Sequence, residues 1–236
     1  MMAILQWGTL IICSVVLLLR VPDAIRGRNR MVFGILVIAT LCSLLSVPGP
    51  YAAIDVALGG WNVTHLILRL LVFAAVLLIG LQVAKGLADA RGYRLVAGPP
   101  GRWALAASVV AVVAAFSLMD TRGSSAGLLD IADNAGHNAV VAPFYAAAGR
   151  TYPGFVSVVL LPALVGTATS HLPRMVRAAA FLTALGAVAT AISVPACFAP
   201  GAWLLAQQSV NYLAVLGYVL GLCLFWFSRL GTKGGR

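Results

Sequence analysis

Polar side chains concentrate between Asp120 and Tyr152, in a chain that is otherwise 61% hydrophobic. This stretch holds three of the six acidic residues. A hydroxyl, a histidine and a carboxylate together can perform nucleophilic catalysis, and the stretch offers Ser124 or Ser125, His137 and Asp130. No nucleophile-elbow pattern surrounds either serine, so we expect no catalytic residues and no enzyme.

The side chains that most often bind metals are scattered: His65, His137, His171, Cys13, Cys42, Cys197 and Cys223. The cysteines form no CxxC pair and the histidines have no HxxxH or HxxE neighbour, so the spacing predicts neither a zinc site nor a disulfide framework. Retinal, which some seven-helix proteins bind through a lysine of the last span, is excluded because the last apolar run contains no lysine. We therefore expect no metal and no cofactor.

Arg69 is the charged residue that falls inside an apolar run. An arginine at the bilayer centre costs about 2.5–3.5 kcal/mol on insertion scales, so such residues pair, face a cavity or extend to the interface. Because Arg69 lies about one turn below His65, near the end of its run, its side chain can extend outward. Two interpretations stay open: extension to the interface or a structural pair with Asp55 or Asp120, or a role as the partner of an anionic ligand.

If Arg69 faces a ligand, Asp120 is the candidate counter-charge, and Gln207, Asn211 and Tyr212 form a hydrogen-bonding wall. This set predicts a transporter-like or small-ligand-binding membrane protein with an outward-facing polar site. The alternative is a non-catalytic subunit, scaffold or sensory module that docks on another membrane protein. Its support is the scarcity of polar residues deep in the apolar runs, since a transport path normally needs more.

The elements that must position these residues are membrane spans. A mean hydropathy of +1.00 with 9% charged residues excludes an ordinary soluble domain. Runs of about 20 apolar residues without strand-like alternation predict helices, since lipid cannot satisfy free backbone groups. We expect one all-α domain, residues 1–236, with seven transmembrane helices at about 3–19, 31–47, 65–84, 103–119, 152–170, 177–194 and 203–227.

The basic residues predict the orientation of these spans. With seven spans, 13 of the 16 lysines and arginines fall on one face, in segments 20–30, 85–102, 174–177 and 229–236. The positive-inside rule makes this face cytoplasmic, so the N-terminus is outside and the C-terminus inside a bacterial cytoplasmic membrane. Short basic clusters between apolar runs predict contact with anionic lipid head groups rather than with nucleic acid, despite the net charge of +10.

The outer loops contain two short apolar segments. Residues 52–58 follow a Pro-Gly-Pro stop and predict a short helix at the outer surface, before an Asn62-Val63-Thr64 glycosylation pattern of low specificity. Residues 120–151 predict an outer loop in which Asn138 to Arg150 is interfacial, re-entrant or part of the fifth span. Pro153, Gly154 and Pro162 favour an interrupted helix there.

Small residues predict two helix-packing faces. Gly217 and Gly221 have the spacing that lets two membrane helices approach closely, and Ala107, Ala111 and Ala115 form a similar ridge. We expect both to pack inside the chain, and a membrane-protein partner or a homo-oligomer stays open.

The order of features resembles an actinobacterial family of seven-span membrane proteins that are named as transporters. The resemblance rests on the arginine-rich segment 20–30, on IDVALGGWNVTHL at 54–66 and on RAAAFLTALGAVATAI at 177–192. It implies a seven-helix fold. Because members of that family usually continue into a cytosolic domain and this sequence ends at Arg236, the resemblance implies no function that resides in such a domain.

Overall fold

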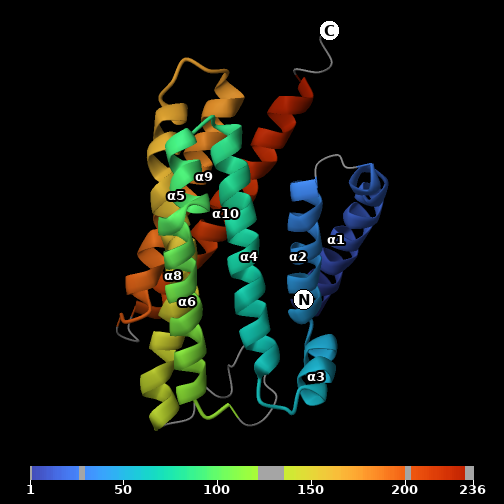
Figure 1. The fold of residues 1–236 in the computed structure, drawn as a ribbon, viewed down its shortest axis with the longest axis vertical. Coiled ribbons are helices and arrows are strands. Elements are labelled where there is room, and N and C mark those ends of the chain that lie inside the picture. Colours follow the sequence, from blue (N-terminus) through green and yellow to red (C-terminus); the bar gives the residue numbers. More distant parts are fainter. Residues whose placement is uncertain (1, 27–29, 122–135, 200–202, 232–236) are drawn as a thin grey trace. The chain divides into compact units, whose positions relative to one another are not determined.

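The computed structural model describes residues 2–26, 30–121, 136–199 and 203–231. Within these ranges the chain forms nine α-helices and no strand (Figure 1). Their bounds are α1 Met2–Ile25, α2 Arg30–Leu45, α3 Pro48–Ala57, α4 Val63–Gly86, α5 Ala90–Ala97, α6 Pro99–Leu118, α8 His137–Ala168, α9 Arg174–Ala196 and α10 Leu204–Gly231. The expected all-helical architecture is confirmed for the described residues.

Five of these helices are long and apolar enough to cross a membrane: α4, α6, α8, α9 and α10. The number rises to six if α2 and α3, which meet at a bend of 88°, count as one broken span. Several long apolar helices are the mark of a multi-pass membrane protein. The described apolar part of α1, Trp7–Pro22, is shorter, so the seventh span stays a prediction.

Helix α3 begins where the sequence stops α2. Its N-cap is Val47 in an extended conformation, and a proline occupies its first turn. Proline suits this position because the first amide of a helix has no intrahelical partner. The short helix therefore starts four residues before the expected segment 52–58 and ends at Ala57.

Helix α8 differs most from the expectation. It runs without a break for 32 residues, so the segment from Asn138 to Arg150 is continuous with the helix that contains the fifth expected span. Residues 137–151 of the expected outer loop 120–151 are therefore helical, and residues 122–135 lie outside the described ranges. Each of Pro143, Pro153 and Pro162 removes only one backbone hydrogen bond, which a long helix in an apolar environment tolerates.

The chain divides into two compact units. Unit 1 comprises Met1–Ile79 and Val109–Tyr145, and unit 2 comprises Gly80–Ser108 and Ala146–Arg236. Buried aromatic side chains mark the core of unit 1, at Tyr51 and Phe73. Buried Leu160 and Leu164 of α8 do so in unit 2. The expectation of one seven-helix domain stays a prediction.

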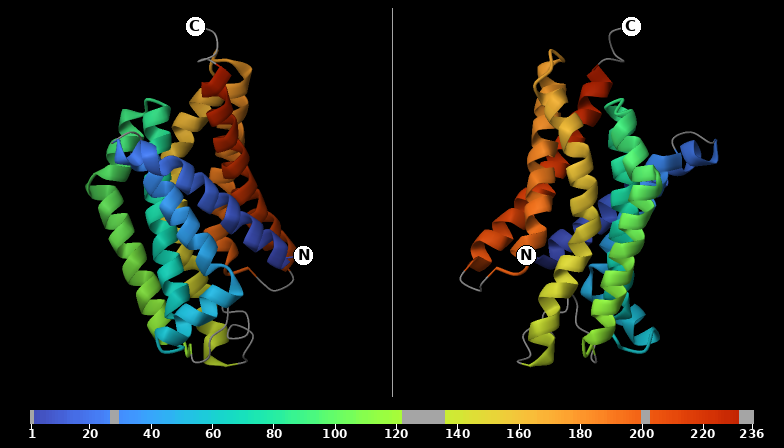
Figure 2. Two further views of the ribbon diagram at one scale, coloured as in Figure 1. Left: turned by 90° about the vertical axis from the view of Figure 1, so that its right-hand side faces the viewer. Right: turned by 60° about the vertical axis from the view of Figure 1, so that its left-hand side comes forward.

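In unit 2, α10 lies against α9 (Figure 2). Glycines line this contact, at Gly186 on α9 and at Gly217 and Gly221 on α10. A Cβ atom at Gly217 would lie 2.6 Å from Gly186 Cα, and one at Gly221 would lie 2.8 Å from Thr183 N. Neither position has room for a side chain. The small-residue pair of α10 therefore lies directly on the backbone of α9, where close packing supplies dispersion contacts that lipid cannot replace.

The alanine ridge of α6 has a different orientation from the expected one. Ala107 and Ala111 are exposed, and only Ala115 is buried. The buried face of the helix runs through Ser108, Val112 and Ala115. Spacing by four residues defines a stripe along a helix, but it does not determine which stripe faces the neighbouring helix.

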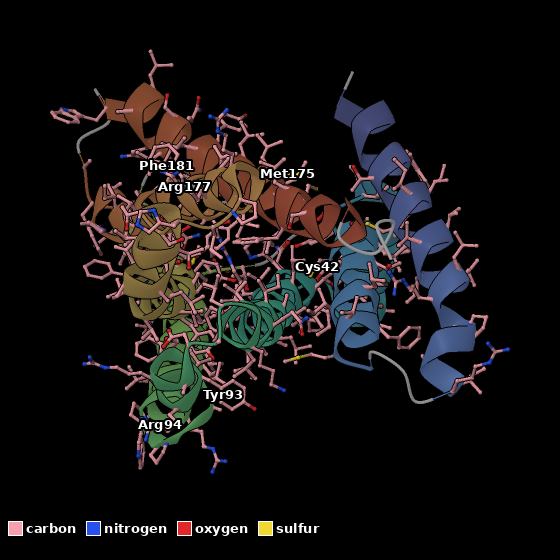
Figure 3. The ribbon with its side chains drawn as sticks, turned by 90° about the horizontal axis from the view of Figure 1, so that it is seen from above. Cys42, Tyr93, Arg94, Met175, Arg177 and Phe181 are labelled. Atoms are coloured by element: carbon pink, nitrogen blue, oxygen red, sulfur yellow. The ribbon has the colours of Figure 1, made fainter. Side chains whose placement is uncertain are left out.

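One end of unit 2 gathers basic side chains. Figure 3 looks onto this end and shows Arg94 on α5 and Arg177 on α9. The exposed cations there are Lys85, Arg91, Arg94, Arg102, Arg174 and Arg177. Helix α5 is held by its N-cap Asp89, which accepts from Gly92 N at 2.9 Å, and by Lys85 Nζ, 5.2 Å from the centroid of the Tyr93 ring.

Candidate functional site

The polar end of unit 1 is built around a buried carboxylate. Asp55 is fully buried, and its oxygens accept the backbone N–H groups of Asn62 at 3.1 Å and of Thr64 at 3.2 Å. These groups belong to the start of α4, where backbone N–H groups lack helical partners and the helix dipole favours negative charge. Asp55 therefore caps α4 from the preceding helix, and this contact occupies both of its carboxylate oxygens.

Asn62 connects three elements at this end. Its Oδ1 accepts from the Tyr51 hydroxyl at 2.8 Å, and its Nδ2 donates to the Thr121 carbonyl at 2.9 Å. Its backbone has φ of 55°, a left-handed conformation that asparagine adopts more readily than most residues. Because the side chain is fully buried, the folded protein does not present the glycosylation pattern at Asn62.

The Tyr51 hydroxyl can donate its hydrogen bond to Asn62 because it stays protonated. It lies in α3, outside the expected spans, and burial raises the pKa of its hydroxyl above the ordinary value. The neighbouring Asp55 carboxylate raises that pKa further. The hydroxyl is therefore a hydrogen-bond donor at any physiological pH.

A second connection joins the end of α6 to the start of α8. Asn138 accepts from the backbone N–H of Asp120 at 2.9 Å and donates to its carbonyl at 2.8 Å. His137 Nε2 lies 2.8 Å from the Leu118 carbonyl. These contacts hold the backbone of Asp120, whereas its side chain is exposed.

Arg69 belongs to a cluster formed by three helices of unit 1. His65 and Arg69 lie four residues apart on α4 and therefore share a face. Tyr145 of α8 places its hydroxyl 2.8 Å from His65 Nδ1 and its ring centroid 5.7 Å from Arg69 Cζ. Phe116 of α6 lies beside Tyr145, with 6.0 Å between the ring centroids. We call these four residues the Arg69 cluster.

The Arg69 cluster combines groups that suit an anion. A guanidinium over a tyrosine ring is stabilised by the negative face of the ring. The Tyr145 hydroxyl is both a donor and an acceptor, so it can serve His65 and a second group together. His65 and Tyr145 are almost fully buried, at 6% and 3% exposure, which fixes their positions.

The five candidate ligand-binding residues do not fall in one unit. Arg69 and Asp120 belong to unit 1, and Gln207, Asn211 and Tyr212 belong to unit 2. Gln207 Nε2 donates to the Ala199 carbonyl at 3.2 Å, so it helps to close the turn between α9 and α10. Tyr212 is 64% exposed. A site that joins all five residues stays a prediction.

Sequence reasoning missed the role of Arg150, because Pro153 suggested that this residue lies outside the span. In the structure Arg150 is part of α8, where its Nη1 donates to the Ser193 carbonyl at 3.3 Å and contacts Cys197 Sγ. The end of α9 tightens so that Cys197 N bonds to Val194 O, and the Ser193 carbonyl accepts from the guanidinium and from Cys197 Sγ, each at 3.3 Å. A cation at a helix C-terminus also complements the helix dipole.

Two hydroxyl pairs within unit 2 were also missed. Ser157 of α8 and Tyr218 of α10 lie 2.7 Å apart, and Thr151 Oγ1 of α8 donates to Ser108 Oγ of α6 at 2.8 Å. In the sequence, the only indication of such pairs is that single hydroxyl-bearing residues interrupt the apolar runs. Their partners lie 43 and 61 positions away and cannot be found from local pattern.

Several expectations concern residues that the structure does not describe. Ser124, Ser125 and Asp130 all lie within 122–135. Among the described side chains, no group of three histidine, cysteine or acidic residues could hold a metal ion.

Comparison with known proteins identifies no relative: no protein-family model matches the chain, and no curated protein or solved structure matches it.

Proposed function

We propose that this chain is a multi-pass protein of a bacterial cytoplasmic membrane that binds a small anionic solute at the Arg69 cluster, as a transporter or a transporter-like binding protein. The resemblance to actinobacterial seven-span proteins named as transporters is consistent with this proposal. Seven spans with the N-terminus outside and the C-terminus inside are part of it.

The distribution of charge supports this topology. Six exposed cations gather at one end of unit 2, and the acidic residue among them, Asp89, is the N-cap of α5. Such an end fits the cytoplasmic face, where anionic head groups attract lysine and arginine. In unit 1 the start of α4 carries the network of Asp55 and Asn62, and Arg69 lies six residues further along, about 9 Å at the helical rise. In the proposed topology this end is the outer one.

One observation carries the proposal. Arg69 lies over the ring of Tyr145, whose hydroxyl is bound to His65, so a cation and two hydrogen-bonding groups converge within apolar helices. Ionisable residues in membrane spans are costly and generally mark substrate or ion pathways. The alternative stays a structural pair of Arg69 with Asp55 or Asp120; the Asp55 carboxylate also accepts two amides at the start of α4.

The proposal is tested with purified protein in detergent and three probe anions: acetate, succinate and phosphate. We expect at least one probe to bind saturably to the wild type and at least 10-fold more weakly to Arg69→Ala. Arg174→Ala is the matched control, because it removes an exposed cation at the basic end and should leave binding unchanged. Circular dichroism must show that both variants are folded. Absence of saturable binding, or equal binding by folded Arg69→Ala, overturns the proposal.

The second candidate function, a non-transporting subunit of a membrane complex, is favoured by a different observation. Large apolar side chains of α1 and α10 are highly exposed, among them Leu19 at 73% and Leu205 at 80%. Either lipid or a partner helix would cover such faces. Mild-detergent purification from the native host separates the two functions: a second protein at fixed stoichiometry supports the subunit, and a monodisperse single chain that binds a probe anion supports the solute-binding protein.

A further inference from the structure

We propose that helix α5 and the first turn of α6 form a binding site for one anionic phospholipid of the membrane. These elements belong to unit 2, whereas the Arg69 cluster belongs to unit 1, so the two sites are independent. General attraction between basic loops and lipid head groups is diffuse. The proposed site instead holds a single lipid through named side chains.

Helix α5 has two distinct faces. It spans eight residues, Ala90–Ala97, which is far too short to cross a bilayer. Gly92 and Val96 lie four positions apart on one face and are buried. Arg91 and Arg94 lie three positions apart on the other side and are exposed. A short helix with one buried face and one basic face suits the plane of the membrane interface.

The backbone that carries these cations is held at both ends. Asp89 caps α5 by accepting from Gly92 N at 2.9 Å. After α5, a Cβ atom at Gly101 would collide with the Val96 carbonyl, so the turn into α6 lies directly on the backbone of α5. Arg102 follows in the first turn of α6. The backbone positions of the arginines are therefore fixed before an anion binds, which lowers the ordering cost of binding.

The positive charge around α5 exceeds the negative charge that the chain supplies there. Segment 85–102 carries four cations, and Asp89 is its only acidic residue. The exposed side chains of Arg91 and Arg102 form no hydrogen bond or ion pair with any residue that the structure describes. Like charges at neighbouring positions of a helix repel each other. An anion from outside the chain would neutralise this excess and remove the repulsion.

The neighbouring side chain favours a lipid as the source of that anion. Trp103 directly follows Arg102 and is 76% exposed. Helix α6 is long and apolar enough to cross a membrane, so its first turn lies at the membrane boundary. Indole rings favour the head-group layer, where cations meet lipid phosphates. A phospholipid therefore contacts both the cations and the ring, whereas a soluble phosphate would gain nothing from the ring.

The test counts the lipids bound to the purified full chain in detergent by native mass spectrometry. Dioleoylphosphatidylglycerol is the anionic probe, dioleoylphosphatidylcholine has the same acyl chains with a zwitterionic head group, and glycerol 3-phosphate is a soluble phosphate. We expect one phosphatidylglycerol to bind at least about 10-fold more tightly than either other probe. Arg91→Gln and Arg102→Gln should each weaken its binding by about 3- to 10-fold, because each removes one cation near the head group.

The matched control is Arg174→Gln, which removes one exposed cation from the same end of unit 2 but lies at the start of α9. Because it leaves α5 and α6 intact, it should change the affinity for phosphatidylglycerol by less than about 2-fold. Arg91→Lys keeps the charge and should retain most of the affinity. Circular dichroism verifies the fold of each variant.

Equal affinity for the two phospholipids, or an equal loss in Arg91→Gln and Arg174→Gln, overturns the inference, because either result leaves only diffuse attraction. Equal affinity for glycerol 3-phosphate and phosphatidylglycerol assigns the site to soluble phosphates and overturns it as well. A short oligodeoxythymidylate is the last probe. If it binds more tightly than phosphatidylglycerol and Arg91→Gln weakens that binding, the surface belongs to nucleic acid. None of these results changes the proposal for Arg69, which its own variant tests.

Discussion

Asn138 forms two hydrogen bonds with the backbone of Asp120, donating to its carbonyl at 2.8 Å and accepting from its N–H at 2.9 Å. The side-chain amide of Asn138 thus takes the place of a backbone hydrogen-bond partner for Asp120, which lies after the end of α6. The Asn138 side chain is buried, which fixes the position of its amide. This single side chain connects two helices across a separation of 18 positions in the sequence.

We expect Asn138→Ala to lower the free energy of unfolding by about 1–3 kcal/mol, the net contribution of two hydrogen bonds. Asn138→Asp should also destabilise, because a carboxylate accepts from the N–H but cannot donate to the carbonyl. Thermal unfolding in detergent measures both effects. The control is Ser117→Ala, since Ser117 is exposed and bonds only to the Val113 carbonyl of its own helix. Equal stability of Asn138→Ala and Ser117→Ala would contradict the structural role.

Asp55→Ala should destabilise the start of α4 by about 1–2 kcal/mol, the upper part of the range for a helix N-cap. Asp55→Asn retains one acceptor oxygen and should cost less, because it loses the charge that complements the helix dipole but keeps one bond. Hydrogen exchange of the amides of Asn62 and Thr64 reports the effect locally. Exchange rates in Asp55→Ala that match those of the wild type would show that the carboxylate does not cap the helix.

The helices themselves follow from composition, because an apolar run that cannot expose its backbone to lipid has no other structure available. The contacts of Asp55 and Arg150 could not be predicted in the same way. Each depends on where another segment ends: Asp55 reaches amides seven and nine positions later, and Arg150 reaches a carbonyl 43 positions later. The continuity of α8 through Pro153 was equally hidden, since local sequence favours a break.

The candidate site was predicted only in part. A charge within an apolar run drew attention to Arg69, and helical spacing places His65 on the same face. Tyr145 was not expected beside them, because it belongs to the segment 138–150 whose place was open. The rotation of α6 about its own axis also decides which of its side chains are buried. The spacing of its alanines does not determine that rotation.

Gly217→Ala should destabilise the protein by about 1–3 kcal/mol, because the added methyl group would press against the backbone of α9 and overpack the interface. Gly166→Ala is the matched control. It lies in α8 with no atom within 4 Å of an added Cβ, so it should be neutral or stabilise by up to about 1 kcal/mol through helix propensity. Thermal unfolding distinguishes the two variants. A Gly217→Ala variant as stable as the control would mean that α9 and α10 are less closely packed than described.

Arg150→Ala should reduce stability without a specific effect on anion binding, the opposite of Arg69→Ala. It leaves the Ser193 carbonyl without the guanidinium, at a cost of about 1–3 kcal/mol. Arg150→Lys keeps a cation near the end of α9 and should recover part of the loss. Unfolding temperature and affinity for a probe anion that the wild type binds, measured on the same preparations, separate the two arginines. Loss of affinity with unchanged unfolding temperature in Arg150→Ala would assign this residue to the binding site.

The proposed topology makes opposite predictions for two exposed positions. Trp61, before α4, should face the outside, and Arg94, on α5, should face the cytoplasm; both side chains are exposed. In a variant whose four native cysteines are replaced by serine or alanine, Trp61→Cys should react with a membrane-impermeant maleimide in intact cells. Arg94→Cys should react only after the cells are permeabilised. One candidate span, α4, separates Trp61 from Arg94, so the two cysteines should lie on opposite sides of the membrane. Labelling of both variants in intact cells would contradict a membrane-spanning α4, and labelling of Arg94→Cys alone would reverse the proposed orientation.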